Sequence, residues 1–148
     1  MISNRERAAI SKRYLNRTKD AHLYIKALES RLNAFTFANI TKYDSDGGTR
    51  TEPRENVQET KMLEFSELNR EIEETRNRID AEDLETKKVI EGVDSFLQRT
   101  ILTERYINFL CWDDIAKRVN YSRSHVLRIH GKALLSLYKS LKEAGLDE

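Results

Sequence analysis

The sequence predicts an all-α protein, with a long N-terminal helical hairpin or coiled coil followed by a smaller C-terminal helical domain. The 148 residues include one proline and five glycines, so few positions interrupt a helix. Apolar residues recur at spacings of three and four, which is the period of an amphipathic helix. Charged residues make up 34% of the chain and hydrophobic residues 39%. This composition is typical of helices with broad solvated faces and a limited core.

The first predicted helix covers about residues 4–37. No Gly or Pro interrupts its apolar positions, which are Ile10, Tyr14, Ala21, Ile25, Leu28, Leu32 and Phe35. A loop is expected over residues 38–56, where Gly47, Gly48 and Pro53 occur among Asp, Ser and Thr residues. Such a loop is long for a compact domain.

The second predicted helix covers about residues 57–81. Its apolar stripe is narrow, as in a coiled-coil seam, and consists of Met62, Phe65, Leu68, Ile72 and Ile79. The simplest arrangement is an antiparallel hairpin with the first helix, giving a first domain over residues 1–81. Two such long helices bury little core, which favours a homodimer or a higher homo-oligomer. The alternative is that these residues serve only intramolecular packing.

A second domain is expected over residues 82–148, made of four helices. The first covers residues 83–96 and is weakened by Gly92, with an apolar side formed by Leu84, Val89, Ile90, Val93 and Phe96. The next covers residues 99–109 and uses Ile101, Leu102, Tyr106 and Leu110. The last two belong to a helix-turn-helix pattern that is centred on residues 112–133.

Three features of the helix-turn-helix pattern stand in register. Ala116 is small, where the two helices must touch, and Asn120 falls four residues later, at a turn that needs a left-handed backbone. Ser122 then stands where an N-cap opens the second helix. The expected buried positions are Ile115, Val119, Tyr121, Val126 and Ile129.

The net charge of +1 conceals a segregation of charge along the chain. Residues 1–51 carry 10 Lys/Arg and 5 Asp/Glu, residues 52–98 carry 7 and 14, and residues 99–142 carry 9 and 3. A basic C-terminal block beside an acidic middle favours a phosphate-bearing partner for that block. The alternative is ordinary surface charge on a helical protein.

Residues 105–137, RYINFLCWDDIAKRVNYSRSHVLRIHGKALLSL, resemble region 4 of sigma-70-type factors. The match is closest to small regulators encoded by phages and prophages of Gram-positive bacteria, such as the late-gene regulators of the ArpU and RinA type. The specific part covers about 45 residues, and the N-terminal half agrees only in outline. Two positions depart from the pattern. Cys111 replaces the usual Ser or Thr cap of the first helix, and Gly131 lies inside the second, where Gly costs about 1 kcal/mol relative to Ala.

The resemblance implies a DNA-binding role for eight residues. Ser122 would present its backbone N–H to a phosphate, while Arg123, Ser124 and Arg128 would reach base edges in the major groove of double-stranded DNA. Lys117, Arg118 and Lys132 would contact backbone phosphates, and His125 would contact either. The alternative for each of these cations is a solvated surface charge.

No enzyme chemistry is expected. His125 and His130 are five residues apart, whereas two ligands on one helix face are usually four apart, so no metal site is predicted. No catalytic residue and no cofactor is predicted either. The single Cys111 fits a reducing compartment, and the sequence contains no apolar run of membrane-spanning length and no signal-peptide pattern. We therefore expect a protein of the bacterial host cytoplasm.

Three function classes follow from the sequence and the resemblance. The first is a sequence-specific transcription regulator of phage origin, which would control late genes. The second is a sigma-like factor that contacts host RNA polymerase. The third is a small terminase-like packaging protein, for which a ring of eight or more subunits would be expected where a regulator would form a dimer.

Overall fold

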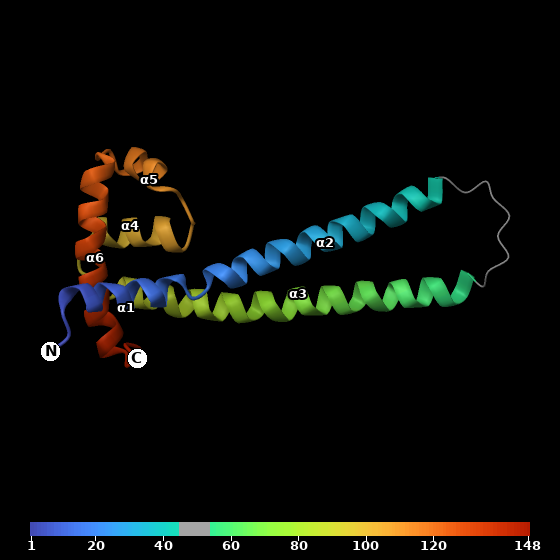
Figure 1. Ribbon diagram of the computed structural model, residues 1–148, viewed down its shortest axis with the longest axis horizontal. Helices are drawn as coiled ribbons and strands as arrows, with labels where there is room; N and C mark the ends of the chain where they lie inside the picture. The colour runs from blue at the N-terminus through green and yellow to red at the C-terminus, as the bar shows by residue number, and fades with distance from the viewer. Residues whose placement is uncertain (45–53) are drawn as a thin grey trace. The chain divides into compact units, whose positions relative to one another are not determined.

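A computed structural model describes residues 1–44 and 54–148, with the side chains of 39–44 and 54–56 left aside. The described residues form α-helices and no strand, which confirms the all-α class. Figure 1 shows the helices in order along the chain: α1 (Asn4–Asn16), α2 (Lys19–Asp44), α3 (Arg54–Glu91), α4 (Phe96–Tyr106), α5 (Trp112–Val119) and α6 (Arg123–Glu143).

The expected first helix over residues 4–37 is wrong in two respects. It breaks at Arg17 and Thr18, and its second part continues beyond residue 37 to Asp44. Tertiary contacts hold the chain at the break, because the Arg17 guanidinium donates to the Glu82 carbonyl and the Glu85 carboxylate of α3, and Thr18 is buried. Residues 38–44 and 54–56 of the expected loop are helical, and Gly47, Gly48 and Pro53 lie outside the described residues.

The two helices expected over 57–81 and 83–96 form one helix of 38 residues, α3. Residues 81–83 contain no Gly or Pro, and core positions continue at alternating spacings of three and four from Leu68 to Val93. The helix ends at Glu91, so Gly92 lies just beyond it rather than inside a helix. Ser95 then caps α4, with its Oγ accepting from the Gln98 N–H at 3.3 Å.

The chain divides into two compact units, residues 20–79 and residues 1–19 with 80–148. This division differs from the expected one at residue 81, because α1 packs with the C-terminal helices. Leu15, which the periodicity missed, is 2% exposed in the same core as Leu134 and Leu137. In addition, the Ser11 hydroxyl donates to the Leu134 carbonyl at 2.8 Å. A residue pattern along one helix does not say which distant helix it will contact.

In the unit of residues 20–79, α2 and α3 pack against each other. Leu28, Leu68 and Ile72 form the buried cluster of this contact, with Leu32 packed against them. The Phe35 and Phe65 rings stack at 5.9 Å, and Arg76 pairs with Glu29 across the two helices. Met62, expected in the seam, is instead 70% exposed.

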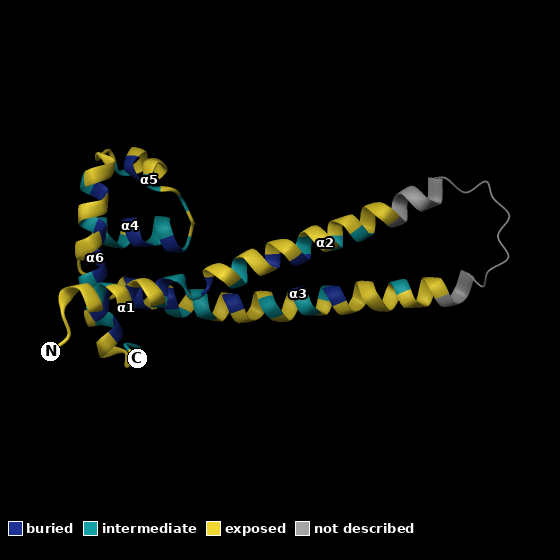
Figure 2. Ribbon diagram, in the orientation of Figure 1, coloured by how far each residue is buried: buried dark blue, intermediate teal, exposed yellow. Residues whose placement is uncertain are grey.

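In the other unit, α6 is the central helix, and α1, α4 and α5 pack against it. Figure 2 shows buried and exposed residues alternating along α6. One cluster joins α1, the end of α3, α4 and the C-terminal half of α6; it consists of Leu15, Val89, Ile90, Val93, Leu102, Tyr106, Ala133, Leu134, Leu137 and Leu141. A second cluster joins α4, α5 and the start of α6; it consists of Ile101, Ile115, Ala116 and Val126.

Gly92 marks a close approach between the end of α3 and α6. A Cβ atom at this position would overlap the Ser140 Oγ and would press on the Val89 carbonyl oxygen. Gly131, inside α6, has open space around the same position. The close approach between helices is therefore at Gly92 and not at Gly131.

We predict that Gly92→Ala lowers the free energy of unfolding by roughly 1–3 kcal/mol, because the Ser140 side chain must rotate and the tight contact between α6 and the end of α3 must loosen. Gly131→Ala is the control, and it should raise this free energy by up to about 1 kcal/mol through helix propensity. Urea unfolding of the two variants measures both effects. Equal effects of the same sign would contradict the assigned packing.

Candidate nucleic-acid interface

The turn between α5 and α6 has the local geometry that the sequence predicts. Asn120 adopts φ 59° and ψ 38°, the left-handed region, and its N–H and that of Tyr121 both donate to the Ala116 carbonyl. Ser122 caps α6, with its Oγ accepting from the His125 N–H at 3.2 Å. Ala116 is 8% exposed in the cluster with Ile115. The left-handed turn, the cap and the buried small residue are confirmed.

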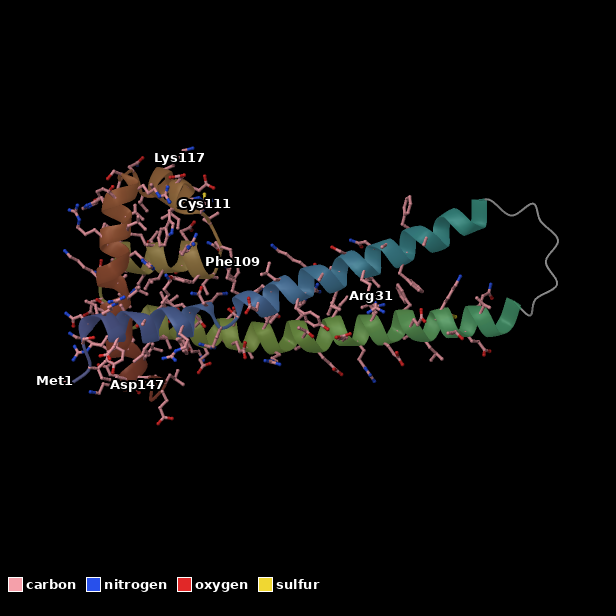
Figure 3. The ribbon with its side chains drawn as sticks, in the orientation of Figure 1. Met1, Arg31, Phe109, Cys111, Lys117 and Asp147 are labelled. Atoms are coloured by element: carbon pink, nitrogen blue, oxygen red, sulfur yellow. The ribbon has the colours of Figure 1, made fainter. Side chains whose placement is uncertain are left out.

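The start of α5 lacks a side-chain cap, as Cys111 suggested. Its N-cap residue makes no side-chain hydrogen bond to the helix, and its thiol is exposed. Asp113 and Asp114 lie in the first turn of α5, and Lys117 and Arg118 lie in the last. The charges at both ends therefore interact favourably with the helix dipole and stabilise the helix. Figure 3 labels Cys111 and Lys117 on this helix.

The expected burial of Tyr121 is wrong. Tyr121 is 45% exposed, and its ring packs on His125 with a centroid separation of 4.7 Å. It lies between the helices, outside the apolar stripe of either one. Ile115 and Val126 are fully buried as expected, while Val119 and Ile129 are partly buried.

The structure leaves most of the eight predicted contact residues accessible. Seven are exposed and His125 is half-buried; the exposed ones are Lys117, Arg118, Ser122, Arg123, Ser124, Arg128 and Lys132. Arg123 and Arg128 do not point the same way, since five residues turn a helix by about 140° beyond a full turn. Tyr121 joins this surface, although its apolar ring gave no such signal in the sequence.

Two of the predicted arginines are paired with acids. Arg118 Nη1 lies 2.9 Å from Glu104 Oε2, and Arg123 Nη1 lies 3.8 Å from Asp113 Oδ1. The sequence analysis missed Glu104, because it lies on α4, 14 residues before its partner.

A buried polar pair lies beneath this surface, at the side of α6 that faces α4. The Tyr106 hydroxyl and His130 Nε2 are 2.7 Å apart, and the Trp112 and His130 rings pack edge to face with their centroids 4.6 Å apart. Burial raises the pKa of Tyr106 to about 12, so its hydroxyl stays protonated. Burial, with the charges of Lys12 and Arg105, lowers the pKa of His130 to about 4. Tyr106 therefore donates to a neutral His130, which carries its proton on Nδ1.

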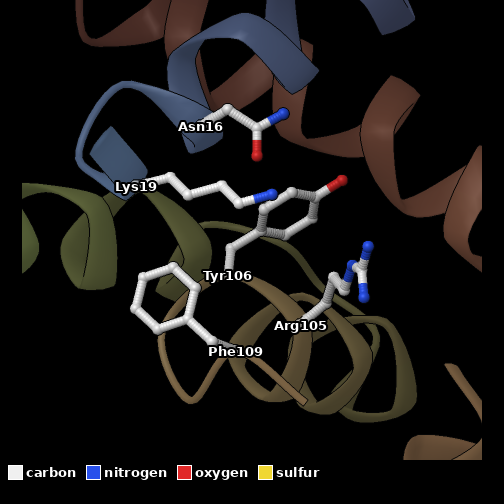
Figure 4. Close-up of a pocket in the computed structure, with 5 residues that line it drawn as sticks. All are labelled: Asn16, Lys19, Arg105, Tyr106 and Phe109. Atoms are coloured by element: carbon white, nitrogen blue, oxygen red, sulfur yellow. The ribbon is translucent and has the colours of Figure 1, made fainter. Parts of the chain in front are cut away.

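A small hollow lies between α1 and the end of α4 (Figure 4). It is lined by Asn16, Lys19, Arg105, Tyr106 and Phe109, and its volume is about 80 Å³. This space suits a few water molecules, whereas ligand pockets usually measure about 300–1,000 Å³. The hollow contains none of the predicted contact residues.

No protein-family model, curated protein or solved structure matches this chain. Among the described residues, no His, Cys, Asp and Glu side chains gather as a metal site would need. None of the described helices combines the length and apolarity needed to cross a membrane.

We predict that the protein loses stability as the pH falls from about 6.5 towards 4, because His130 binds a proton in the unfolded state before it does so in the folded state. The contribution of His130 to the free energy of unfolding is complete above its unfolded pKa. The loss of this contribution at low pH should reach at most about 3 kcal/mol. His130→Gln keeps an acceptor for Tyr106 but does not titrate. Chemical unfolding at several pH values should show a smaller slope for this variant over this interval, and a slope equal to that of the wild type would contradict the assignment.

Proposed function

We propose that the protein is a sequence-specific regulator of transcription, of phage or prophage origin, which binds double-stranded DNA through α5 and α6. The observation that carries this proposal is the left-handed turn at Asn120, followed at once by a Ser122-capped helix with exposed cations. In a helix-turn-helix, such a second helix enters the major groove while the first crosses the backbone. The resemblance to sigma region 4 supports the same assignment.

The charge of α6 fits this role. It contains five Lys/Arg and a single acid, Glu143, near its C-terminal end. In the proposed complex, Arg123, Ser124 and Arg128 reach base edges, and the N-terminus of α6 at Ser122 receives a phosphate. The cations of α5 and Lys132 contact flanking phosphates, which fix the position of the protein without reading sequence.

The test begins with selection of bound sequences from random double-stranded DNA, followed by titration of a selected and a random duplex. Affinity should fall steeply with salt, with a log–log slope of magnitude about 4–8. Arg123→Ala or Arg128→Ala should cost about 1–3 kcal/mol on the selected duplex and almost nothing on the random one.

Lys117→Ala and Arg118→Ala are the comparison, and each should weaken both duplexes similarly and reduce the salt slope by about one. A flat salt dependence with no selected sequence would refute DNA binding. If all four variants lose affinity equally on both duplexes, the proposed reading face is incorrect.

We also propose that the protein forms a homodimer through residues 20–79. Large apolar side chains on this unit are exposed, namely Leu23 at 55%, Tyr24 at 48%, Met62 at 70% and Leu63 at 64%. Large exposed apolar side chains on two long helices with a small shared core favour a partner that covers them. Sedimentation equilibrium at tens of micromolar should give twice the chain mass of 17.4 kDa. A monomer would refute the dimer, and a ring of eight or more subunits would favour DNA packaging instead.

A further inference from the structure

Two carboxylates lie against arginines of the proposed DNA surface. Glu104 reaches Arg118 from α4, and Asp113 reaches Arg123 from the start of α5. An acid on a surface that meets phosphate repels the DNA, so each carboxylate opposes binding in general. Because each carboxylate also contacts an arginine, it has a second effect, which favours binding by holding that arginine in place.

The Glu104 carboxylate is itself held in place. Its side chain is 14% exposed, and its Oε1 accepts from Asn108 Nδ2 at 3.1 Å while its Oε2 accepts from Arg118. The Arg118 side chain is 61% exposed. A guanidinium has five N–H donors, and the bond to Glu104 uses one of them. Arg118 is thus anchored at one corner, with further donors directed to solvent.

The pair of Asp113 and Arg123 is looser, with a separation of 3.8 Å and side chains 68% and 60% exposed. A pair of this kind contributes little to folding stability. Its effect is on Arg123 itself, because an arginine loses rotamer freedom when it binds. A neighbouring carboxylate restricts that freedom before DNA arrives.

We propose that Glu104 and Asp113 are positioning residues, which hold Arg118 towards a DNA phosphate and Arg123 towards a base edge. This inference rests on the proposed function. Repulsion acts on every DNA sequence alike, whereas positioning helps only where Arg123 meets the correct base. Asp113 therefore lowers the affinity for random DNA and raises the ratio of specific to non-specific affinity.

The decisive experiment compares Asp113→Asn with Asp114→Asn in the full-length protein. Both acids are exposed in the first turn of α5, and each change removes one negative charge. Among the described residues, the ion pair with Arg123 is formed by Asp113. The two variants therefore share the loss of repulsion and the loss of helix-dipole stabilisation, and they differ in the positioning of Arg123.

Titrations with the selected and random duplexes should separate the two effects. Both variants should bind random DNA about two- to threefold more tightly, as expected for one less repulsive charge. Asp113→Asn should lower the ratio of selected to random affinity by about three- to tenfold, part of what a complete bidentate base contact supplies. Asp114→Asn should leave that ratio unchanged, and Asp113→Glu should restore it.

A double-mutant cycle tests Glu104. Arg118→Ala should reduce affinity and salt slope in the wild-type background, and it should have a smaller effect on affinity in Glu104→Gln, where a neutral amide holds the guanidinium less strongly than the carboxylate does. Additive effects of Glu104→Gln and Arg118→Ala would overturn the positioning of Arg118.

The outcomes distinguish this inference from the proposed function. If Asp113→Asn and Asp114→Asn change the affinity ratio equally, or not at all, the positioning of Arg123 is refuted while DNA binding stands. If the wild-type protein binds neither duplex, and selection enriches no sequence, both the proposed function and this inference are refuted.

Discussion

The burial of α6 is the constraint on which the C-terminal unit depends. One side of this helix is covered by α1, α4 and α5, and Leu137 and Leu141 are fully buried within that contact. A helix held along one side must leave the other side to solvent. The exposed side of α6 is therefore carried by a backbone that a core on its other side holds in place. Binding residues on such an element are positioned more accurately than residues on a loop.

The same constraint explains why α1 belongs with the C-terminal helices. Without α1, the side of α6 near Leu134 would be exposed, and a short four-helix unit would have a smaller core. Leu15 fills this site, and the Ser11 hydroxyl uses a backbone carbonyl of α6 that its own helix leaves accessible. A segment from the opposite end of the sequence, α1, thus completes the core of this unit.

Local features were predictable from the sequence, and long-range ones were not. The turn at Asn120, the cap at Ser122 and the small residue at Ala116 follow from conformational preferences of single residues, which act over a few positions. The helical class follows from periodicity. The break at Arg17, by contrast, depends on tertiary contacts, and the periodicity of residues 4–37 runs through it. The merging of two expected helices into α3 shows that the absence of a breaker carries more weight than a change in the apolar stripe.

For the candidate site, the sequence identified which cations are exposed but not what they contact. Arg118 and Arg123 are accessible as expected, yet the acids beside them come from α4 and from the opposite end of α5. Tyr121 has an apolar ring that favours burial by composition, but the turn that it occupies has no core beneath it, and the ring packs on His125 instead.

Trp112 is the single tryptophan of the chain, and its surroundings make it an optical reporter of this unit. Its indole lies between the Arg105 guanidinium, 4.6 Å from the ring centroid, and the edge-on ring of His130. A protonated imidazole quenches an excited indole by accepting an electron, whereas a neutral one does so far less. Tryptophan emission from the unlabelled protein should therefore record both the protonation state of His130 and the separation of α5 from α6, with no second tryptophan to confuse the signal.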